Sequence, residues 1–196
     1  ADAQRRDALL RIAPAHFDAV VAPRHDRLQG DNVIETLGAL NPVDDAWLEQ
    51  GRKRFPAFSA LPARRTAVLI GASSASVTLD DGWFAALLET LAGEHVQTGG
   101  SFLVSTSRRT PAARSAQLRQ QFARWPGIFW GGPEDGENPY AGILGWADRI
   151  IVSPDSVNMV SDASAIGKTV HAFTVATLRG KLAAFHEALR AAGNLL

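Results

Sequence analysis

Polar residues that could bind an anion follow two apolar runs in the part of the chain after residue 65. The runs are 66–70 and 101–105, and each leads into a loop rich in glycine, hydroxyl or guanidinium groups. Backbone N–H groups and hydroxyls can approach a phosphate closely, and an arginine fork matches two phosphate oxygens at once. A plain flexible loop explains the first segment equally well, and a solvated basic turn is the alternative for the second. The residues that we expect to contact phosphate are Gly71, Ser73, Ser74, Ser107, Arg108 and Arg109.

A third candidate segment follows the apolar run 149–152. Asp155 and Ser156 form a turn there, and Met159 and Asp162 come about one and two helical turns later, near the same side of a predicted helix. A carboxylate at this place can accept both hydrogens of a ribose diol. The alternative is that Asp155 or Ser156 only caps the helix.

Asn138 and Tyr140 form a fourth candidate, because an amide and an aromatic face could contact a base or a sugar. A helix cap followed by a core tyrosine explains this pair fully on the pattern alone. His25, with Asp26 beside it, is the candidate catalytic residue or phosphate ligand of the N-terminal third, where a surface turn is the alternative.

Apolar runs alternate with amphipathic stretches from residue 66 to the end, which predicts the elements that hold these loops. The predicted strands are 66–70, 101–105, 128–130, 149–152 and 169–173. We expect helices to begin at Thr78 and Thr110 and to end at Gly93 and Gly167. Serial βα units indicate a Rossmann-like parallel sheet with helices on both faces, and ligands bind beyond the carboxyl ends of such strands. The first loop lacks the GxGxxG spacing of a dinucleotide fingerprint.

The N-terminal third has a different pattern. It contains predicted strands at 17–23 and 32–34 and a predicted helix at 45–55, followed by a segment with two prolines and two arginines. We therefore expect residues 1–55 to be the end of an incomplete αβ domain, 56–65 to be a linker, and 66–196 to be the Rossmann-like domain.

Composition excludes several classes of function. The formal net charge is zero, which gives no overall field to attract nucleic acid, and the absence of cysteine excludes disulfides and thiolate chemistry. The five histidines are far apart in sequence, so we expect no metal site. No apolar run approaches the ~20 residues of a membrane span, which favours a cytoplasmic protein. Abundant arginine and alanine suggest a bacterial source.

The chain resembles the mitochondrial-fission "elongated mitochondria" family, including its bacterial members. The segments that carry the resemblance are Val21-Ala-Pro-Arg-His-Asp26, Asn32-Val-Ile, Gly38-Ala-Leu, Leu69-Ile-Gly, Ser107-Arg-Arg-Thr-Pro111, Asn138-Pro-Tyr140, Ala147-Asp148, Asp155-Ser156 and Met159. More distantly, the C-terminal part is similar to the nucleotide-binding domain of GT-B glycosyltransferases. That likeness implies an acidic residue on the ribose, where this chain has Asp162 and glutamate is more usual. It also implies a larger N-terminal domain that holds the acceptor.

These observations lead to one expectation and two alternatives. We expect a GT-B-like protein that binds a nucleoside-diphosphate sugar without a metal or other cofactor, and that is of glycosyltransferase type when complete. A non-catalytic scaffold that binds a protein partner or itself is one alternative. The other is a nucleotide-sugar epimerase of the same fold.

Overall fold

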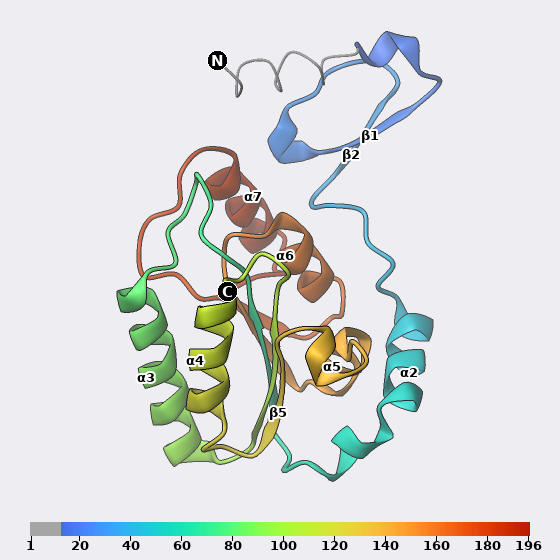
Figure 1. Ribbon diagram of the computed structural model, residues 1–196. Helices are drawn as coiled ribbons and strands as arrows, with labels where there is room; N and C mark the ends of the chain where they lie inside the picture. The colour runs from blue at the N-terminus through green and yellow to red at the C-terminus, as the bar shows by residue number, and fades with distance from the viewer. Residues whose placement is uncertain (1–12) are drawn as a thin grey trace.

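The main body of the protein is a five-stranded parallel sheet flanked by helices on both faces, as predicted (Figure 1). The computed structural model describes residues 13–196. All neighbouring strands of this sheet are paired in parallel. The strands, in spatial order, are β5 (Gly127–Trp130), β4 (Ser101–Thr106), β3 (Arg65–Ile70), β6 (Arg149–Val152) and β7 (Thr169–Ala172).

Alternate residues of the central strand face opposite sides of the sheet, as the two-residue period of a strand requires. Ala67 and Leu69 of β3 belong to one buried cluster, whereas Val68 and Ile70 belong to the other. The first cluster is covered by α2 (Asp45–Arg54), α5 (Tyr140–Trp146), α6 (Val157–Ser164) and α7 (Gly180–Ala191). The second is covered by α3 (Asp81–Thr98) and α4 (Ala112–Phe122).

Several predicted helix boundaries are wrong. The N-cap of α3 is Asp80 and not Thr78, because the Asp80 carboxylate accepts the N–H of Trp83 at 2.9 Å. The same helix passes Gly93 and ends at Thr98, where Gly99 takes a left-handed conformation. The Thr110 hydroxyl donates to the carbonyl of Gly71 instead of capping a helix, and α4 begins two residues later. Similarly, α6 ends at Ser164, before the left-handed Gly167.

The N-terminal third forms a small separate sheet and one docked helix. Strands β1 (Val20–Pro23) and β2 (Val33–Thr36) pair in parallel, above the carboxyl edge of the large sheet (Figure 1). Among residues 13–196 the 3₁₀ turns are η1 (Pro14–His16), η2 (Arg24–Asp26), η3 (Pro56–Ala60) and η4 (Pro133–Asp135). The predicted domain division remains a prediction, and residues 1–12 of its first segment lie outside the described residues.

Helix α2 packs closely on α5, with Leu48 in the main core. A Cβ atom on Gly51 would lie 2.3 Å from the carbonyl oxygen of Ala141, and one on Gly145 would lie 2.7 Å from that of Leu48. The two helix backbones are therefore in direct contact, which only glycine allows at these places.

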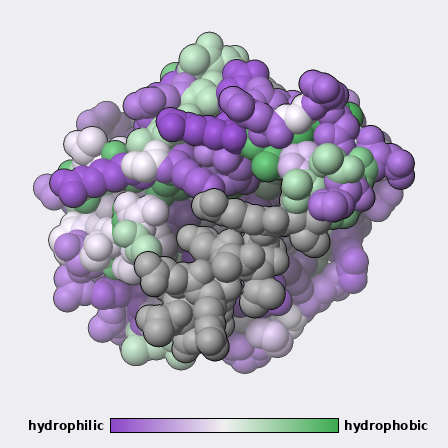
Figure 2. Space-filling model, turned by 90° about the horizontal axis from the view of Figure 1, so that it is seen from above, coloured by the Kyte–Doolittle hydropathy of each residue, from purple (hydrophilic) through white to green (hydrophobic). Residues whose placement is uncertain are grey.

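The segment between β2 and α2 is anchored to α6, where the Ala39 N–H donates to Ser161 Oγ at 2.9 Å. Seen from above, the described surface on this side of the molecule is mainly hydrophilic (Figure 2). No helix among residues 13–196 is long and apolar enough to cross a membrane.

Candidate functional site

The carboxyl ends of β3 and β6 lie side by side at the point where the strand order reverses. From β3 the chain continues to β4 and β5 on one side, and then returns to β6 and β7 on the other. The loops that leave β3 and β6 therefore diverge. In open parallel sheets this is the place where ligands bind.

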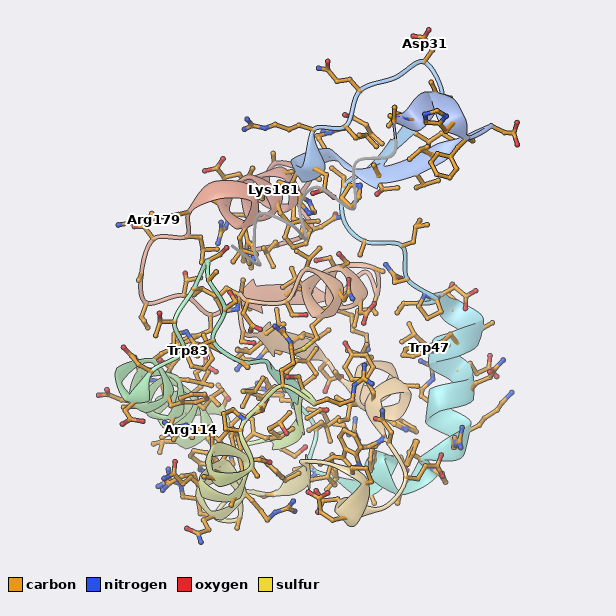
Figure 3. All side chains as sticks on the ribbon, turned by 45° about the horizontal axis from the view of Figure 1, so that its top comes forward. Asp31, Trp47, Trp83, Arg114, Arg179 and Lys181 are labelled. Atoms are coloured by element: carbon orange, nitrogen blue, oxygen red, sulfur yellow. The ribbon has the colours of Figure 1, made fainter. Side chains whose placement is uncertain are left out.

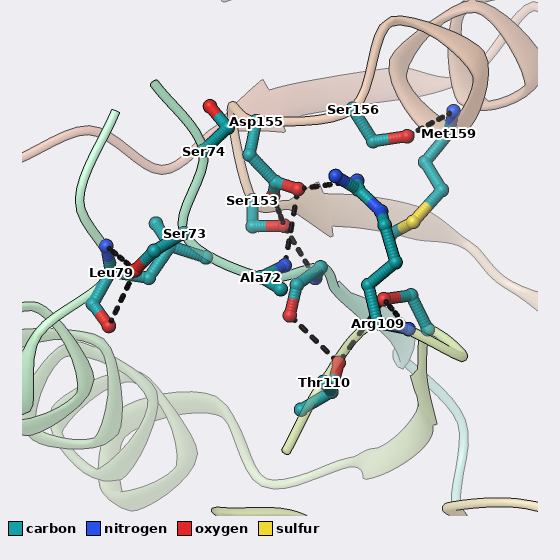
Figure 4. A network of polar contacts seen from close by, with 12 residues as sticks. Ala72, Ser73, Ser74, Leu79, Arg109, Thr110, Ser153, Asp155, Ser156 and Met159 are labelled. Carbon is teal, nitrogen blue, oxygen red and sulfur yellow. Dashed lines mark hydrogen bonds and ion pairs between the residues drawn. The ribbon is translucent and has the colours of Figure 1, made fainter. Parts of the chain in front are cut away.

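Asp155 joins the loops at this point (Figure 4). Its Oδ2 accepts hydrogen bonds from the backbone N–H of Ala72 at 3.1 Å and from Nη2 of Arg109 at 2.9 Å. Its Oδ1 accepts the Ser153 hydroxyl at 2.7 Å, and Ser153 Oγ accepts the Gly71 N–H at 2.7 Å. The Asp155 side chain has 0% of its surface exposed. This carboxylate is therefore placed to position Ala72 and Arg109 and is closed to solvent.

Gly71 is required by the same carboxylate. A Cβ atom at this position would lie 2.2 and 2.3 Å from the two Asp155 oxygens, far inside van der Waals contact. The Gly71 carbonyl accepts the Thr110 hydroxyl at 2.7 Å. Both polar groups of the Gly71 backbone are thus used within the protein, in a turn predicted to contact phosphate.

The loop after β4 is attached to the end of β3 as well. The Ser107 N–H donates to the carbonyl of Ile70 at 2.8 Å, and the Ser107 and Thr110 hydroxyls lie 3.2 Å apart. The Ser107 hydroxyl also accepts the N–H of Arg109 at 3.2 Å. The loops after β3, β4 and β6 consequently form one hydrogen-bonded unit.

The two adjacent arginines differ in their contacts. Arg109 pairs with Asp155, although 54% of its side chain remains exposed. Arg108 is exposed and makes no hydrogen bond or ion pair with any residue that the structure describes. It lines a pocket of about 480 Å³ at the carboxyl ends of β4 and β5, together with Thr110, Ser115, Arg119, Trp130 and Gly132.

The far wall of this pocket is fixed by Asp135. Its carboxylate accepts Nη2 of Arg119 at 2.5 Å and the N–H of Gly131 at 2.6 Å. The Arg119 hydrogen bond is the main reason that the pKa of Asp135 is lowered. The loop after β5 is thereby held against α4, and the pocket has a defined shape.

The predicted ribose residue, Asp162, is half-buried and accepts the Tyr140 hydroxyl at 3.1 Å. Burial raises the pKa of Asp162, and the Tyr140 hydrogen bond opposes that shift. Burial and then the Asp162 charge raise the pKa of Tyr140 above its ordinary range. Asn138 Oδ1 accepts the N–H of Tyr140 at 3.0 Å, but the N-cap of α5 is Pro139, so the predicted cap at Asn138 is one residue too early.

The remaining predicted ligands have structural contacts. Ser73 Oγ accepts the Leu79 N–H at 2.8 Å, and Ser74 Oγ accepts the N–H of Ser76 at 3.3 Å, so both hydroxyls shape the loop after β3. Ser156 caps α6, and Met159 packs against the main core.

His25 is apart from this unit. Its ring packs on Phe185 of α7 with 5.1 Å between ring centroids, and it lines a different pocket. That places it against the last helix rather than with the residues joined by Asp155.

Three residues that support the site were not among the predicted ligands: Ser153 and Thr110, which lie in the candidate segments, and His186, which does not. His186 is fully buried in α7, and its Nε2 lies 3.0 Å from the carbonyl oxygen of Pro154, directly before Asp155. Burial lowers the pKa of His186 to about 4. One signal was available, because His186 follows Leu182 by four residues on the core side of an amphipathic helix.

No group of three or more histidine, aspartate or glutamate residues among residues 13–196 is arranged to hold a metal ion.

Two solved structures of the wall teichoic acid polymerase TagF are similar in fold. They match 81% and 82% of this chain and 38% and 40% of their own, with TM-scores of 0.41 and 0.39 and sequence identities of 11% and 13%. Likeness at this level carries no functional inference.

Sequence comparison is more specific and confirms the predicted resemblance. The mitochondrial fission protein ELM1 of Arabidopsis thaliana is 30% identical over 202 residues. The match covers 90% of this chain and 47% of that protein, so the chain spans about half the length of this relative. The family model described as "Mitochondrial fission ELM1" matches residues 11–195. The chain therefore belongs to the mitochondrial fission ELM1 family.

Proposed function

We propose that the carboxyl edge of the large sheet binds the diphosphate of a nucleoside-diphosphate sugar, as the donor half of a GT-B-like protein. The ligand class follows from the groups that this edge offers. Guanidinium groups suit a diphosphate, and the Asp162 carboxylate suits a ribose diol.

The arrangement of Arg108 and Arg109 is the observation that carries the proposal. Asp155 holds Arg109, whereas Arg108 lies beside a pocket of about 480 Å³ and has no polar partner within residues 13–196. A cation without an internal partner, next to a preformed pocket at the carboxyl edge, favours an anionic ligand. We assign the main phosphate contact to Arg108 and a second one to the exposed part of Arg109.

Asp162 supports the nucleoside part of the proposal. Only one of its two carboxylate oxygens has a hydrogen-bond partner among the described residues, namely the Tyr140 hydroxyl. The other oxygen can accept one hydroxyl of a ribose. The short aspartate side chain is fixed from one side by Tyr140, which limits how the ribose can approach.

Glycosyl transfer by the whole protein is the further part of this proposal. Transfer needs an acceptor and a group that takes up its proton. In our proposal neither comes from the residues at the diphosphate site, whose polar side chains position loops or contact the donor. We therefore propose that this chain contributes donor binding, and that residues outside the diphosphate site contribute the acceptor and the base.

Isothermal titration of this chain with UDP, GDP, CDP and a UDP-sugar tests the donor site. All proposed ligand residues lie within the chain, so binding should be measurable without any further segment. We expect saturable binding of at least one nucleotide, weakened about tenfold or more in Arg108→Ala, because a charge-assisted hydrogen bond contributes roughly 1.5–3 kcal/mol.

Arg124→Ala is the matched control, since Arg124 is an exposed arginine at the opposite end of α4, with its guanidinium 4.5 Å from the centroid of the Trp125 ring. It should leave nucleotide binding unchanged. If no nucleotide binds, the proposal is wrong and a non-catalytic scaffold becomes the better account.

A further inference from the structure

A second pocket, of about 450 Å³, lies between η2 and α7, outside the proposed nucleotide site. Turn η2 follows β1 directly, so the pocket is at the carboxyl end of the small parallel sheet. Lys181, at the start of α7, lies just below this segment (Figure 3). The residues of the pocket used below are Arg24, His25, Arg27, Glu35, Ala184 and Ala188.

The pocket has a surplus of positive charge. Arg24 lies 3.5 Å from Glu35, so these two charges largely balance. Asp26 is engaged by Lys181 at 2.9 Å, in a second balanced pair beside the pocket. Arg27 has no acidic partner within the described part of the chain, and its guanidinium is the uncompensated charge.

His25 adds a nitrogen without a partner. Its Nδ1 is buried and makes no hydrogen bond to any residue from 13 to 196. The ring is held against Phe185. Burial lowers the pKa of His25, so the ring is neutral at pH 7, and a neutral imidazole can offer one N–H. Buried polar atoms in native proteins nearly always have partners. Because Nδ1 is closed to solvent, the imidazole must turn to bring an N–H to a ligand in the pocket.

The floor of the pocket is small and apolar. Ala184 and Ala188 are four residues apart and therefore lie on one face of α7. Their methyl groups leave room that larger side chains would fill. Arg27 has a φ of 53°, a left-handed conformation that is unfavourable for a residue other than glycine. The turn thus holds Arg27 in a conformation that its own backbone does not favour.

We propose that this pocket binds the phosphate monoester group of a small phosphorylated molecule. Arg27 and Arg24 contact the phosphate oxygens, the His25 imidazole donates one hydrogen bond, and the carbon skeleton lies over Ala184 and Ala188. This site does not depend on the nucleotide site, since the two share no residue.

Titration calorimetry with inorganic phosphate, glycerol 3-phosphate and glucose 6-phosphate tests the proposal, with glycerol and glucose as uncharged controls. We expect saturable binding of the phosphorylated probes only. Arg27→Ala should weaken it about tenfold, the loss expected for one charge-assisted hydrogen bond. Arg190→Ala, an exposed arginine of α7 outside the pocket, should leave binding unchanged.

Two further measurements separate this site from alternatives. Ala188→Leu fills the floor, so it should weaken binding of glucose 6-phosphate more than that of inorganic phosphate. Ligand should also shift the ¹⁵N resonances of the His25 imidazole. Arg108→Ala should change neither result, so failure here and failure of the nucleotide site are distinguishable. The proposal is overturned if no phosphorylated probe binds, or if Arg27→Ala binds as tightly as the unchanged chain.

Discussion

The loops joined by Asp155 and the pocket between η2 and α7 are two polar regions that differ in internal bonding, although the buried Nδ1 of His186 behind Asp155 also has no partner among the described residues. Around Asp155, both carboxylate oxygens, the Ser153 hydroxyl and the Gly71 backbone have partners at 2.7–3.1 Å within the protein. Around η2, Arg27 and the Nδ1 atom of His25 have none among the described residues.

This difference separates positioning from binding. A buried polar group that is satisfied internally stabilises one arrangement of loops, and it costs free energy to break. An unsatisfied donor or cation beside a pocket has capacity left for a ligand. Arg108 resembles the second region in this respect, although it lies next to the first. Changes around Asp155 should therefore affect mainly stability, and changes at Arg108 or Arg27 mainly binding.

The largest effect is expected for Asp155→Ala. The change removes the carboxylate that accepts hydrogen bonds from the Ala72 N–H, the Ser153 hydroxyl and Arg109. Because Arg109 is more than half exposed, its ion pair contributes little to the loss of stability. We expect a loss of roughly 3 kcal/mol in the free energy of unfolding, measured by urea denaturation. Asp155→Asn is the control and should lose less, because its amide oxygen can still accept the Ala72 N–H. Equal losses in the two variants would contradict the role of this acceptor.

His186 should make the same region sensitive to acid. Its pKa is about 4 in the folded protein and 6.5 ordinarily, so the unfolded chain takes up the proton first as the pH falls. Neutral His186 contributes fully to the free energy of unfolding above about pH 6.5. This contribution, roughly 2–3 kcal/mol, is lost as the pH falls from 6.5 to 4. When the free energy of unfolding is measured across this pH range, its slope against pH should be shallower for His186→Gln, because glutamine does not titrate. Parallel curves would show that His186 does not carry the effect.

Gly71→Ala should destabilise the protein by about 2 kcal/mol, because the new methyl group overlaps the Asp155 carboxylate. The same change in an Asp155→Ala background should cost much less, since the obstructing group is gone. A double-mutant cycle by urea denaturation measures this coupling. Additive losses would mean that Gly71 is needed for another reason.

The smallest effect on stability is expected for Arg109→Ala. More than half of the Arg109 side chain is exposed, so solvent screens its ion pair with Asp155. The loss should be about 0.5 kcal/mol by urea denaturation. A loss as large as that of Asp155→Ala would show that the two regions do not differ as described. Arg109→Lys keeps the charge and serves as the comparison.

Much of the fold was predictable because each strand is a local pattern. The β3 run Thr66–Ile70 is apolar at every position after the first, which is typical of a strand buried on both faces, and the structure confirms the parallel sheet. The predicted helix end at Gly93 is wrong, and it was predicted because glycine commonly ends a helix. In α3 Gly93 is exposed with no atom near its Cβ position, and beyond it the His95 ring packs on Phe102 and Trp125, which holds the last turn of the helix.

The site was predictable only in part. The loops that carry polar chemistry were found, because polar residues directly after buried strands must lie at one edge of a parallel sheet. Their internal bonds were not found. Ala72 and Asp155 are 83 residues apart, and Arg109 and Asp155 are 46 apart. No local pattern indicates which arginine pairs with the carboxylate and which is left without a partner.

The sequence alone therefore determined the order of strands and helices along the chain, the edge of the sheet at which polar loops gather, and the family to which the chain belongs. These depend on short-range periodicity and on motifs within one segment. Only the tertiary structure decided that Asp155 is enclosed, that Gly71 has no room for a side chain, and that His25 lies on α7. Those properties depend on distances between segments far apart in sequence, which are set only when both faces of the sheet are packed.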